Sequence, residues 1–313
     1  MRVLVVTAVA AEADSVAAGL DRFARSGVRE LTGGYEIAGH AQFTPRPGSV
    51  QIPVVDVLAG GVGPTASAVA TATALAASPY DPPYHLVISA GIAGGFRHRA
   101  PVGSLVVADS IVAADLGAET PDGYLPVEEL GFGRSVHRPP AELTARIAKI
   151  LDAATAGGPA PAGGQAPAGR SAPAGGLAPA GGLAPAGGRA PAGWSAPAGG
   201  QAPAVGAATA ASGPGSAQGS GTVLAPILTV STATGTAARA AELTARHPRA
   251  AAEAMEGFGV AEAAAVHSVP CVEIRAVSNA VGPRDRASWE IGRALGALRY
   301  AFTLLTPVFE EPS

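Results

Sequence analysis

A long low-complexity repeat divides this chain and decides which of its residues can form a folded core. From about Ala156 to Gly221 the sequence repeats Ala-Pro-Ala-Gly-Gly, with Gln, Arg, Leu or Trp at the variable position. Proline removes backbone hydrogen-bond donors, glycine raises the entropic cost of ordering, and the repeat offers little apolar surface to bury. We therefore predict that 156–221 is a disordered insertion, which a fold tolerates because closure entropy grows only logarithmically with loop length. Residues 1–155 and 222–313 are expected to form one domain around it.

The rest of the chain alternates apolar strands with helices. Such alternation predicts an α/β fold with three layers, in which helices cover both faces of a parallel or mixed central sheet. Ligands of such folds lie beyond the carboxyl ends of the strands. The apolar runs predict strands at residues 3–9, 54–58, 84–89, 104–108, 223–230 and 271–277, and helices at 12–20, 65–77, 236–246, after Glu256 and at 288–305.

Glycine-rich segments follow two of the predicted strands. Gly60-Gly61-Val62-Gly63 follows the second, and Ala90-Gly91-Ile92-Ala93-Gly94-Gly95 follows the third and is predicted to be a turn. Turns of this kind can hold phosphate with backbone amides, but neither the strict G-x-G-x-x-G spacing nor a phosphate-loop motif is present. We therefore expect these glycines to let the backbone approach a flat base or a sugar, and not a nucleotide cofactor.

Composition excludes several classes of protein. The net charge is −3 and the basic residues form no dense cluster, which argues against nucleic acid as a partner. The single cysteine, Cys271, lies in an apolar run and is expected to be a buried thiol, and the six histidines lack metal-binding spacing. The first apolar run is only about nine residues long, too short to span a membrane, so a cytoplasmic protein without a membrane partner is expected.

Two carboxylates are candidates for chemistry. Glu12 follows the first strand in a turn of small residues, where it is either a solvated helix-start carboxylate or part of a site. Glu256 follows an alanine-rich segment, predicted as helix or loop, and lies between Met255 and Gly257-Phe258. We expect mainly apolar surroundings for Glu256, so that it needs a hydroxyl or amide partner such as a ribose hydroxyl.

Asn279 is the third candidate and ends an apolar strand. It is either a turn residue before Gly282-Pro283 or an amide that meets the edge of a purine.

Taken in order, these motifs resemble the nucleoside phosphorylase/nucleosidase superfamily. The resemblance rests on Glu12, a glycine turn, Ser89 to Gly95, Met255-Glu256 and Arg275-Ala276-Val277-Ser278-Asn279. The pattern is most similar to futalosine hydrolases, in the branch that contains methylthioadenosine/S-adenosylhomocysteine nucleosidases. It implies a nucleoside phosphorylase-like fold and hydrolysis of the N-glycosidic bond of futalosine to hypoxanthine and dehypoxanthine futalosine, in menaquinone biosynthesis. It further implies that water and the nucleoside are the only reactants, that no cofactor is needed, and that the protein is a homo-oligomer.

The resemblance also implies roles for individual residues. Glu12 matches the carboxylate that positions and activates the attacking water, and Glu256 matches the one that accepts hydrogen bonds from the ribose hydroxyls. Asn279 stands where methylthioadenosine-type enzymes carry an aspartate that acts as general acid. The remaining matches bind the ribose or line the base pocket: Ala93, Gly94, Thr232, Ala233, Met255 and Ser278.

Several alternatives stay open. Because an amide cannot deliver a titrating proton at neutral pH, Asn279 favours a 6-oxopurine over adenine, but it also fits a nucleoside-binding protein without turnover. The loop 8–13 contains Glu12 and no basic residue, which favours water over the phosphate of a phosphorylase. A methylthioadenosine-type nucleosidase and a purine nucleoside phosphorylase remain alternatives. The role of Asp285 is open, and four arginines are candidates for the distal carboxylate of the substrate: Arg97, Arg99, Arg134 and Arg284.

Overall fold

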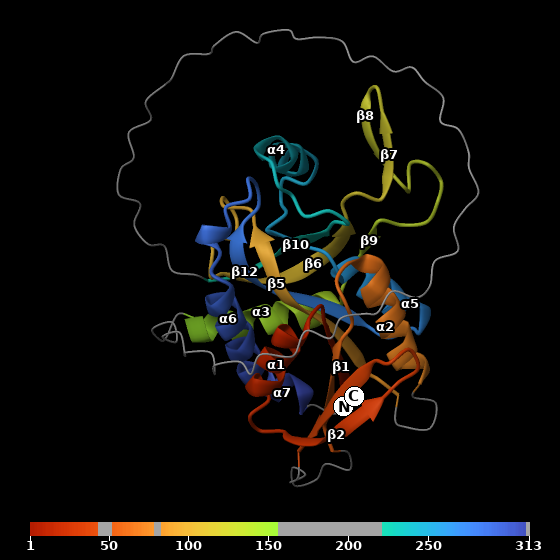
Figure 1. The fold of residues 1–313 in the computed structure, drawn as a ribbon, viewed down its shortest axis with the longest axis vertical. Coiled ribbons are helices and arrows are strands. Elements are labelled where there is room, and N and C mark those ends of the chain that lie inside the picture. The colour runs from red at the N-terminus through yellow and green to blue at the C-terminus, as the bar shows by residue number, and fades with distance from the viewer. Residues whose placement is uncertain (43–51, 78–82, 156–220, 311–313) are drawn as a thin grey trace, which may run out of the picture. The chain divides into compact units, whose positions relative to one another are not determined.

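The computed structural model describes residues 1–42, 52–77, 83–155 and 221–310 (Figure 1). The predicted insertion lies outside the described residues, apart from Gly221 at its end. The described segments on either side of it belong to one compact unit.

The described residues build a ten-stranded mixed sheet, as predicted. Strand β1 runs parallel to both of its neighbours, β4 and β5, whereas β12 runs parallel to β5 and antiparallel to β6. The order of the strands is β11-β10-β6-β12-β5-β1-β4-β3-β2, and β9 pairs with β6. The bounds are β1 (Arg2–Thr7), β2 (Ala24–Glu30), β3 (Glu36–Ala41), β4 (Val54–Ala59), β5 (Leu86–Gly95), β6 (Leu105–Ala113), β9 (Val136–His137), β10 (Thr222–Thr229), β11 (Ala252–Ala254) and β12 (Cys271–Ala280), with a separate hairpin of β7 (Gly117–Thr120) and β8 (Gly123–Pro126).

Helices cover both faces of this sheet. On one side lie α1 (Ala10–Gly19), α3 (Ala141–Thr155) and α6 (Ile291–Leu304), and on the other lie α2 (Pro64–Ala76) and α5 (Gly257–Val266), as Figure 1 shows. The shorter elements are α4 (Ala237–Arg246), the 3₁₀ turn η1 (Arg286–Ser288) and α7 (Thr306–Phe309). Across the described ranges, no helix combines the length and the apolar character that crossing a bilayer requires.

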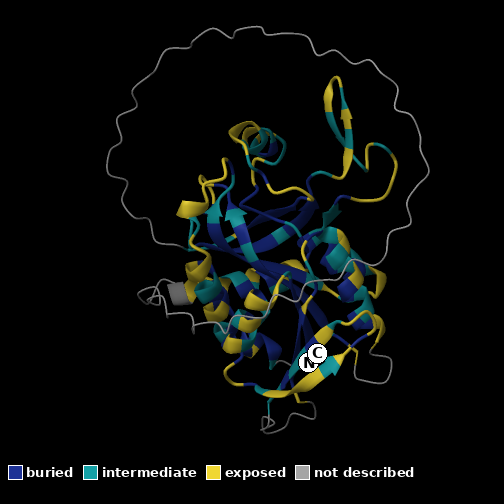
Figure 2. Ribbon diagram, in the orientation of Figure 1, coloured by how far each residue is buried: buried dark blue, intermediate teal, exposed yellow. Residues whose placement is uncertain are grey.

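Strand β1 shows why the fold has three layers. Val3 and Val5 pack in the core cluster that includes α1, α3 and α6, whereas Leu4 and Val6 pack in the cluster that includes α2 and α5. Successive side chains of a strand point to opposite faces, so a strand with only apolar residues is buried on both sides. Figure 2 shows the central strands as buried and the outer helix faces as exposed. Each fully buried Val or Leu side chain contributes about 1.5–3 kcal/mol.

The predicted turn at Ala90–Gly95 is wrong, because these residues form the second half of β5. This half pairs with β12 on one side, and its last two residues pair with β11 on the other. A Cβ on Gly95 would lie 2.2 Å from the carbonyl oxygen of Ala100 and 2.6 Å from Cγ1 of Val277. The glycines of this segment therefore allow close packing inside a strand, not a change of direction.

Strand β11 links the edges of the central strands. It pairs in parallel with β10 and antiparallel with β5, so that β5, β12, β6, β10 and β11 form a closed ring of neighbours. The alanine-rich segment predicted as helix or loop is thus a short strand followed by the turn at Met255 and Glu256. The ring brings the ends of β5, β10 and β12 together at one place.

Helices α2 and α5 meet closely at their first turns. Gly63 has a φ of +92°, and Pro64 occupies the first turn of α2. A Cβ on Gly259 of α5 would lie 1.9 Å from the carbonyl oxygen of Pro64, so only glycine permits this approach. The contact places Glu256, the residue before α5, beside the backbone of Gly63.

Candidate active site

A fully buried arginine, Arg275 of β12, stands at the centre of the polar residues. Its Nη1 lies 3.0 Å from Oε2 of Glu256, and its Nε donates to Oε1 of Glu273 at 2.8 Å. Its Nη2 donates to Oγ of Ser89 at 3.1 Å. Burial alone would lower the pKa of Arg275, but Glu273, Glu256 and Glu12 outweigh burial and raise it. Arg275 is therefore a fixed cation, and each of its three guanidinium nitrogens has a partner.

Glu12 is buried beside this cation, with 3% of its surface exposed. Its Oε2 accepts hydrogen bonds from the amides of Ala8 at 2.9 Å and Val9 at 3.3 Å, and its Oε1 accepts one from the amide of Ile92 at 2.8 Å. The interpretation of Glu12 as a solvated helix-start carboxylate is therefore wrong. The link between β1 and α1 and the strand β5 together hold both carboxylate oxygens in place.

Gly91 of β5 makes room for these two charged groups. A Cβ at this position would lie 2.6 Å from Oε1 of Glu12 and 2.7 Å from Nη1 of Arg275. Any larger residue would displace one of them. The glycine-rich segment thus serves the site, although it does so as a strand that approaches two side chains.

Glu256 is the second carboxylate and is 5% exposed. Besides the ion pair with Arg275, its Oε1 accepts from the amide of Gly63 at 3.3 Å, and its Oε2 accepts from the amide of Met255 at 3.3 Å. The expected apolar surroundings are wrong, because a guanidinium and two amides face the carboxylate. Met255 itself is half-buried and packs against the apolar cluster at the ends of β6 and β10.

Glu273 is a third carboxylate, which sequence reasoning missed. It is fully buried, and its Oε2 has no hydrogen-bond partner among the described residues. Burial, with a smaller contribution from Glu256, raises the pKa of Glu273 to about 7 although Arg275 lowers it. A signal was present, because Glu273 and Arg275 are charged residues two apart in an apolar strand and therefore share one face.

The Ser278-Asn279 pair lies at the end of β12, where the strand changes register. The hydroxyl of Ser278 donates to Oδ1 of Asn279 at 2.8 Å, and Nδ2 of Asn279 donates to the carbonyl of Ala280 at 3.1 Å. Asn279 faces Gly94 across the ladder, and Oγ of Ser278 lies 3.3 Å from the carbonyl of Ala93. The structure thus brings Ala93, Gly94, Ser278 and Asn279 together.

Thr232 and Ala233 lie on the exposed loop after β10. Among the residues described, no hydrogen bond joins either of them to the buried carboxylates. Their neighbour Thr234 is buried, and its amide donates to Oε1 of Glu253 at 2.8 Å while its hydroxyl bonds to Oε2. Burial raises the pKa of Glu253, and the hydrogen bonds from Thr234 lower it. Because Glu253 faces Gly94 in the ladder, the loop is attached to the same edge of the sheet.

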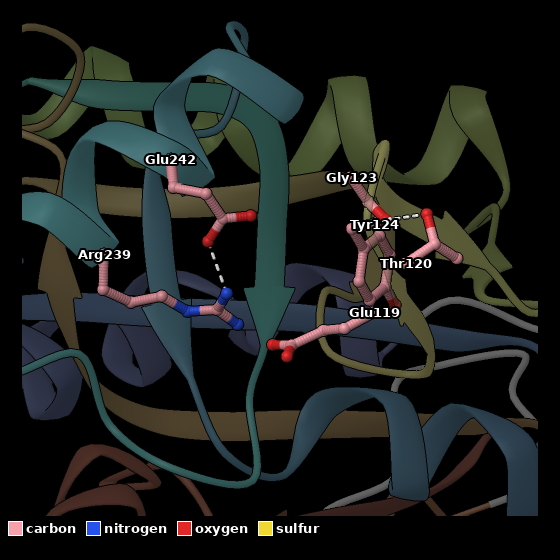
Figure 3. A pocket seen from close by; sticks show the side chains of 6 residues that line it. All are labelled: Glu119, Thr120, Gly123, Tyr124, Arg239 and Glu242. Atoms are coloured by element: carbon pink, nitrogen blue, oxygen red, sulfur yellow. Dashed lines mark hydrogen bonds and ion pairs between the residues drawn. The ribbon is translucent and has the colours of Figure 1, made fainter.

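An open cavity of about 310 Å³ lies between the β7–β8 hairpin and α4 (Figure 3). An ion pair between Arg239 and Glu242 forms its α4 side. Its lining contains none of the predicted site residues, and consists of Glu119, Thr120, Gly123, Tyr124, Arg239 and Glu242. The candidate site is therefore the buried polar cluster and not this cavity.

Comparisons with known proteins show the family of the chain. The model of the Phosphorylase superfamily matches residues 3–165. The chain is 46% identical over 257 residues to the futalosine hydrolase of Streptomyces coelicolor, which covers 82% of this chain and 80% of that protein. It is 37% identical over 304 residues to the futalosine hydrolase of Acidothermus cellulolyticus, which covers 96% of this chain and 89% of that protein.

Among solved structures, that of the futalosine hydrolase of Helicobacter pylori is similar in fold. It aligns with a TM-score of 0.64 at 13% identity and covers 98% of each chain. The fold, the family model and the two curated relatives agree, and the chain belongs to the phosphorylase superfamily and, within it, to the futalosine hydrolase family.

Proposed function

We propose that this chain is an N-glycosyl hydrolase that cleaves futalosine and releases hypoxanthine and dehypoxanthine futalosine, in the futalosine route to menaquinone. One observation carries the proposal: three buried carboxylates, Glu12, Glu256 and Glu273, surround the single cation Arg275. Cleavage of a glycosidic bond develops positive charge on the sugar, and an excess of fixed negative charge beside the ring stabilises it. Two relatives named futalosine hydrolase, at 46% and 37% identity, support this substrate.

Glu12 would orient and activate the water. A carboxylate oxygen has about two lone pairs for hydrogen bonds. Oε1 of Glu12 accepts one bond, from the amide of Ile92, and so keeps a lone pair for a water molecule. The three amide bonds to the carboxylate hold it in one orientation, so little reorganisation is needed when the water attacks.

Glu256 would bind the ribose. Its Oε1 accepts a single bond, from Gly63, and keeps acceptor capacity for a sugar hydroxyl. Met255, which is half-buried next to it, supplies apolar surface for the flat face of the sugar. Arg275 fixes the position of Glu256 through the ion pair.

Asn279 would hold the base. Ser278 donates to Oδ1 of Asn279, which sets the orientation of the amide, and Nδ2 spends one hydrogen on Ala280. The second hydrogen of Nδ2 remains for an acceptor on a 6-oxopurine. We assign Ala93 and Gly94, together with Thr232 and Ala233 on the neighbouring loop, to the walls of the base pocket.

Water fits this site better than phosphate as the second reactant. Each nitrogen of Arg275 has a partner in Glu256, Glu273 or Ser89, and the neighbouring carboxylates compensate its charge, so this buried cation does not attract a phosphate. The loop 8–13 has no basic residue, and carboxylates beside it would repel an anion. The proposed reaction needs no cofactor.

We further propose that the enzyme acts in the cytoplasm as a homo-oligomer. A free thiol at Cys271 fits a reducing compartment. Phe132 is 73% exposed and Leu116 is 42% exposed, both in the segments next to the β7–β8 hairpin. Exposed apolar side chains of this size suit a contact between subunits, and light scattering on the purified protein would measure its mass.

Product analysis tests the function. The purified protein is incubated with futalosine, inosine and methylthioadenosine in phosphate-free buffer, and free base is followed by chromatography. Hypoxanthine from futalosine without phosphate is the expected result. Adenine from methylthioadenosine would assign the chain to the alternative nucleosidase activity, and base released only after phosphate is added would make it a phosphorylase. No base under either condition would mean a nucleoside-binding protein.

A further inference from the structure

The loop between β12 and α6 returns to the candidate site. At its start the amide of Val281 donates to the carbonyl of Gly95 at 2.9 Å, and at its end the amide of Glu290 donates to the carbonyl of Ser278 at 2.8 Å. Trp289, half-buried, is therefore held next to the Ser278-Asn279 pair.

Asp285 gives this loop a defined shape. Its carboxylate caps the turn η1 by accepting from the amide of Ala287 at 3.1 Å, and its carbonyl accepts from the hydroxyl of Ser288 at 2.9 Å. The side chain of Asp285 thus stabilises the turn between Arg284 and Trp289.

Arg284 belongs to this loop and faces the loop after β10. A Cβ on Gly235 would lie 3.5 Å from Cγ of Arg284, so the arginine stem packs against the turn that follows Thr232 and Ala233. The guanidinium carbon lies 5.4 Å from the centre of the Trp289 ring. A cation and an aromatic ring thus stand side by side, where the loop after β10 meets the loop that leads from β12 to α6.

Two of the three other candidate arginines, Arg99 and Arg134, have partners, whereas the exposed Arg97 resembles Arg284 in having no hydrogen bond or ion pair among the described residues. Arg284 differs from Arg97 in the Trp289 ring beside it. Arg99 donates to the carbonyl of Pro248 at 3.3 Å, Arg134 lies 3.7 Å from Glu262, and Arg293 lies 2.9 Å from Glu290. Among the residues described, no carboxylate lies within ion-pairing distance of Arg284. Its exposed guanidinium is therefore available to an anionic group of a ligand.

We propose that Arg284 and Trp289 form the subsite for the aromatic carboxylate that futalosine carries at the end remote from its base. This inference rests on the proposed function. The guanidinium of Arg284 binds the carboxylate with charge-assisted hydrogen bonds, and Trp289 offers its ring surface to the aryl group. The subsite distinguishes futalosine from inosine, whose 5′ end is a hydroxyl.

The test compares two substrates that differ only at the distal carboxylate, which is charged in futalosine and neutral in its methyl ester. The value of kcat/KM for hypoxanthine release is measured with futalosine and with its carboxylate methyl ester, for the parent and for Arg284→Gln. Loss of a hydrogen bond to a charged group predicts a decrease of about 10- to 100-fold for futalosine, mostly in KM, and less than about twofold for the ester. Arg284→Lys keeps the charge but not the planar fork and should recover part of the loss. Trp289→Leu should weaken the binding of both substrates, since both carry the aryl group.

Two further variants serve as controls. Arg286→Gln removes an exposed arginine of the same loop and should leave both substrates unchanged. The subsite would be overturned if Arg284→Gln lowered kcat/KM equally for the acid and the ester, or for neither. It would also be overturned if Arg97→Gln lowered kcat/KM for the acid alone. In those cases the parent still releases hypoxanthine, whereas a parent inactive on both substrates would overturn the proposed function and the subsite with it.

Discussion

Two buried arginines of this chain stand in opposite electrostatic settings. Near the start of β1, Arg2 donates to Oδ2 of Asp56 from Nε at 3.1 Å and from Nη2 at 2.8 Å. The same Oδ2 accepts from the hydroxyl of Tyr84 at 2.6 Å and lies 3.8 Å from Arg29. In the candidate site the carboxylates outnumber the cations, because one cation, Arg275, neighbours Glu12, Glu256 and Glu273.

The difference separates a structural network from a reactive one. At Asp56 the donors converge on Oδ2, so the acceptor capacity of this oxygen is spent inside the protein. Around Arg275 the carboxylates keep unused acceptors, such as Oε2 of Glu273. Buried charge without full compensation is costly, and it persists where a ligand or a reaction uses it.

The largest expected effect follows from removing the cation of the reactive network. Arg275→Met leaves three carboxylates buried without their counter-charge, so we expect a loss of about 3–5 kcal/mol in the free energy of unfolding and no measurable hypoxanthine release. Urea unfolding and product chromatography on the same preparation provide both numbers. Arg2→Met is the matched control, which should also destabilise the fold but retain activity per folded molecule. A folded Arg275→Met protein with parental kcat would contradict the assignment of the site.

Glu12→Gln should affect chemistry more than stability. Loss of the general base predicts a decrease of about 100- to 10,000-fold in kcat. Because the new amide nitrogen faces backbone N–H groups, we also expect a loss of about 1–3 kcal/mol in stability. Nucleoside binding, measured by calorimetry, should persist. Asp14→Asn, an exposed change two residues further along α1, should change neither quantity. Parental turnover in Glu12→Gln would remove Glu12 from the mechanism.

The strands that present the site follow directly from the sequence, whereas the cation at its centre does not. The apolar runs 3–9 and 271–277 correspond to β1 and β12, so the placement of Glu12 after a strand and of Asn279 at the end of one is confirmed. The importance of Arg275 depends on partners from β5, α1 and the turn before α5, which lie far away in sequence. Sequence patterns show that a charge lies in a strand, but not what neutralises it.

Two errors in the prediction of secondary structure from the sequence have the same origin. Glycine runs predict turns, yet Gly91 lies inside β5 because β12 pairs with this segment, and Glu12 and Arg275 occupy the space that a side chain would need. Alanine has a high helix propensity, yet Ala252–Ala254 form β11 because β10 and β5 flank it with free ladder positions. In both cases tertiary contacts overrule a local preference.

The pH dependence of stability tests whether Glu273, in the network around Arg275, is a buried carboxyl with a raised pKa. The pKa of this carboxyl is about 7 in the folded protein against an ordinary value of 4.5, so the folded state binds more protons than the unfolded state between these values. Stability therefore falls as the pH rises from 4.5 to 7, and Glu273→Gln removes this fall. The free energy of unfolding of the parent relative to the variant should decrease between pH 5 and pH 8, by up to about 3 kcal/mol. Urea titrations at four pH values measure it, with the exposed change Glu290→Gln as control. A constant difference would place the titration elsewhere.

The smallest expected effect comes from the structural network. Tyr84→Phe removes one donor to Asp56 but leaves both bonds from Arg2. Burial raises the pKa of Tyr84, so its hydroxyl stays a neutral donor at every pH where the protein is assayed. Its loss predicts about 1–2 kcal/mol less stability and, because the network is separate from the site, a kcat/KM within about twofold of the parent. Tyr300→Phe at the surface controls for the removal of a hydroxyl. If Tyr84→Phe instead lowered kcat at unchanged stability, the two arginine networks would be coupled through the sheet, and the division between structural and reactive charge would fail.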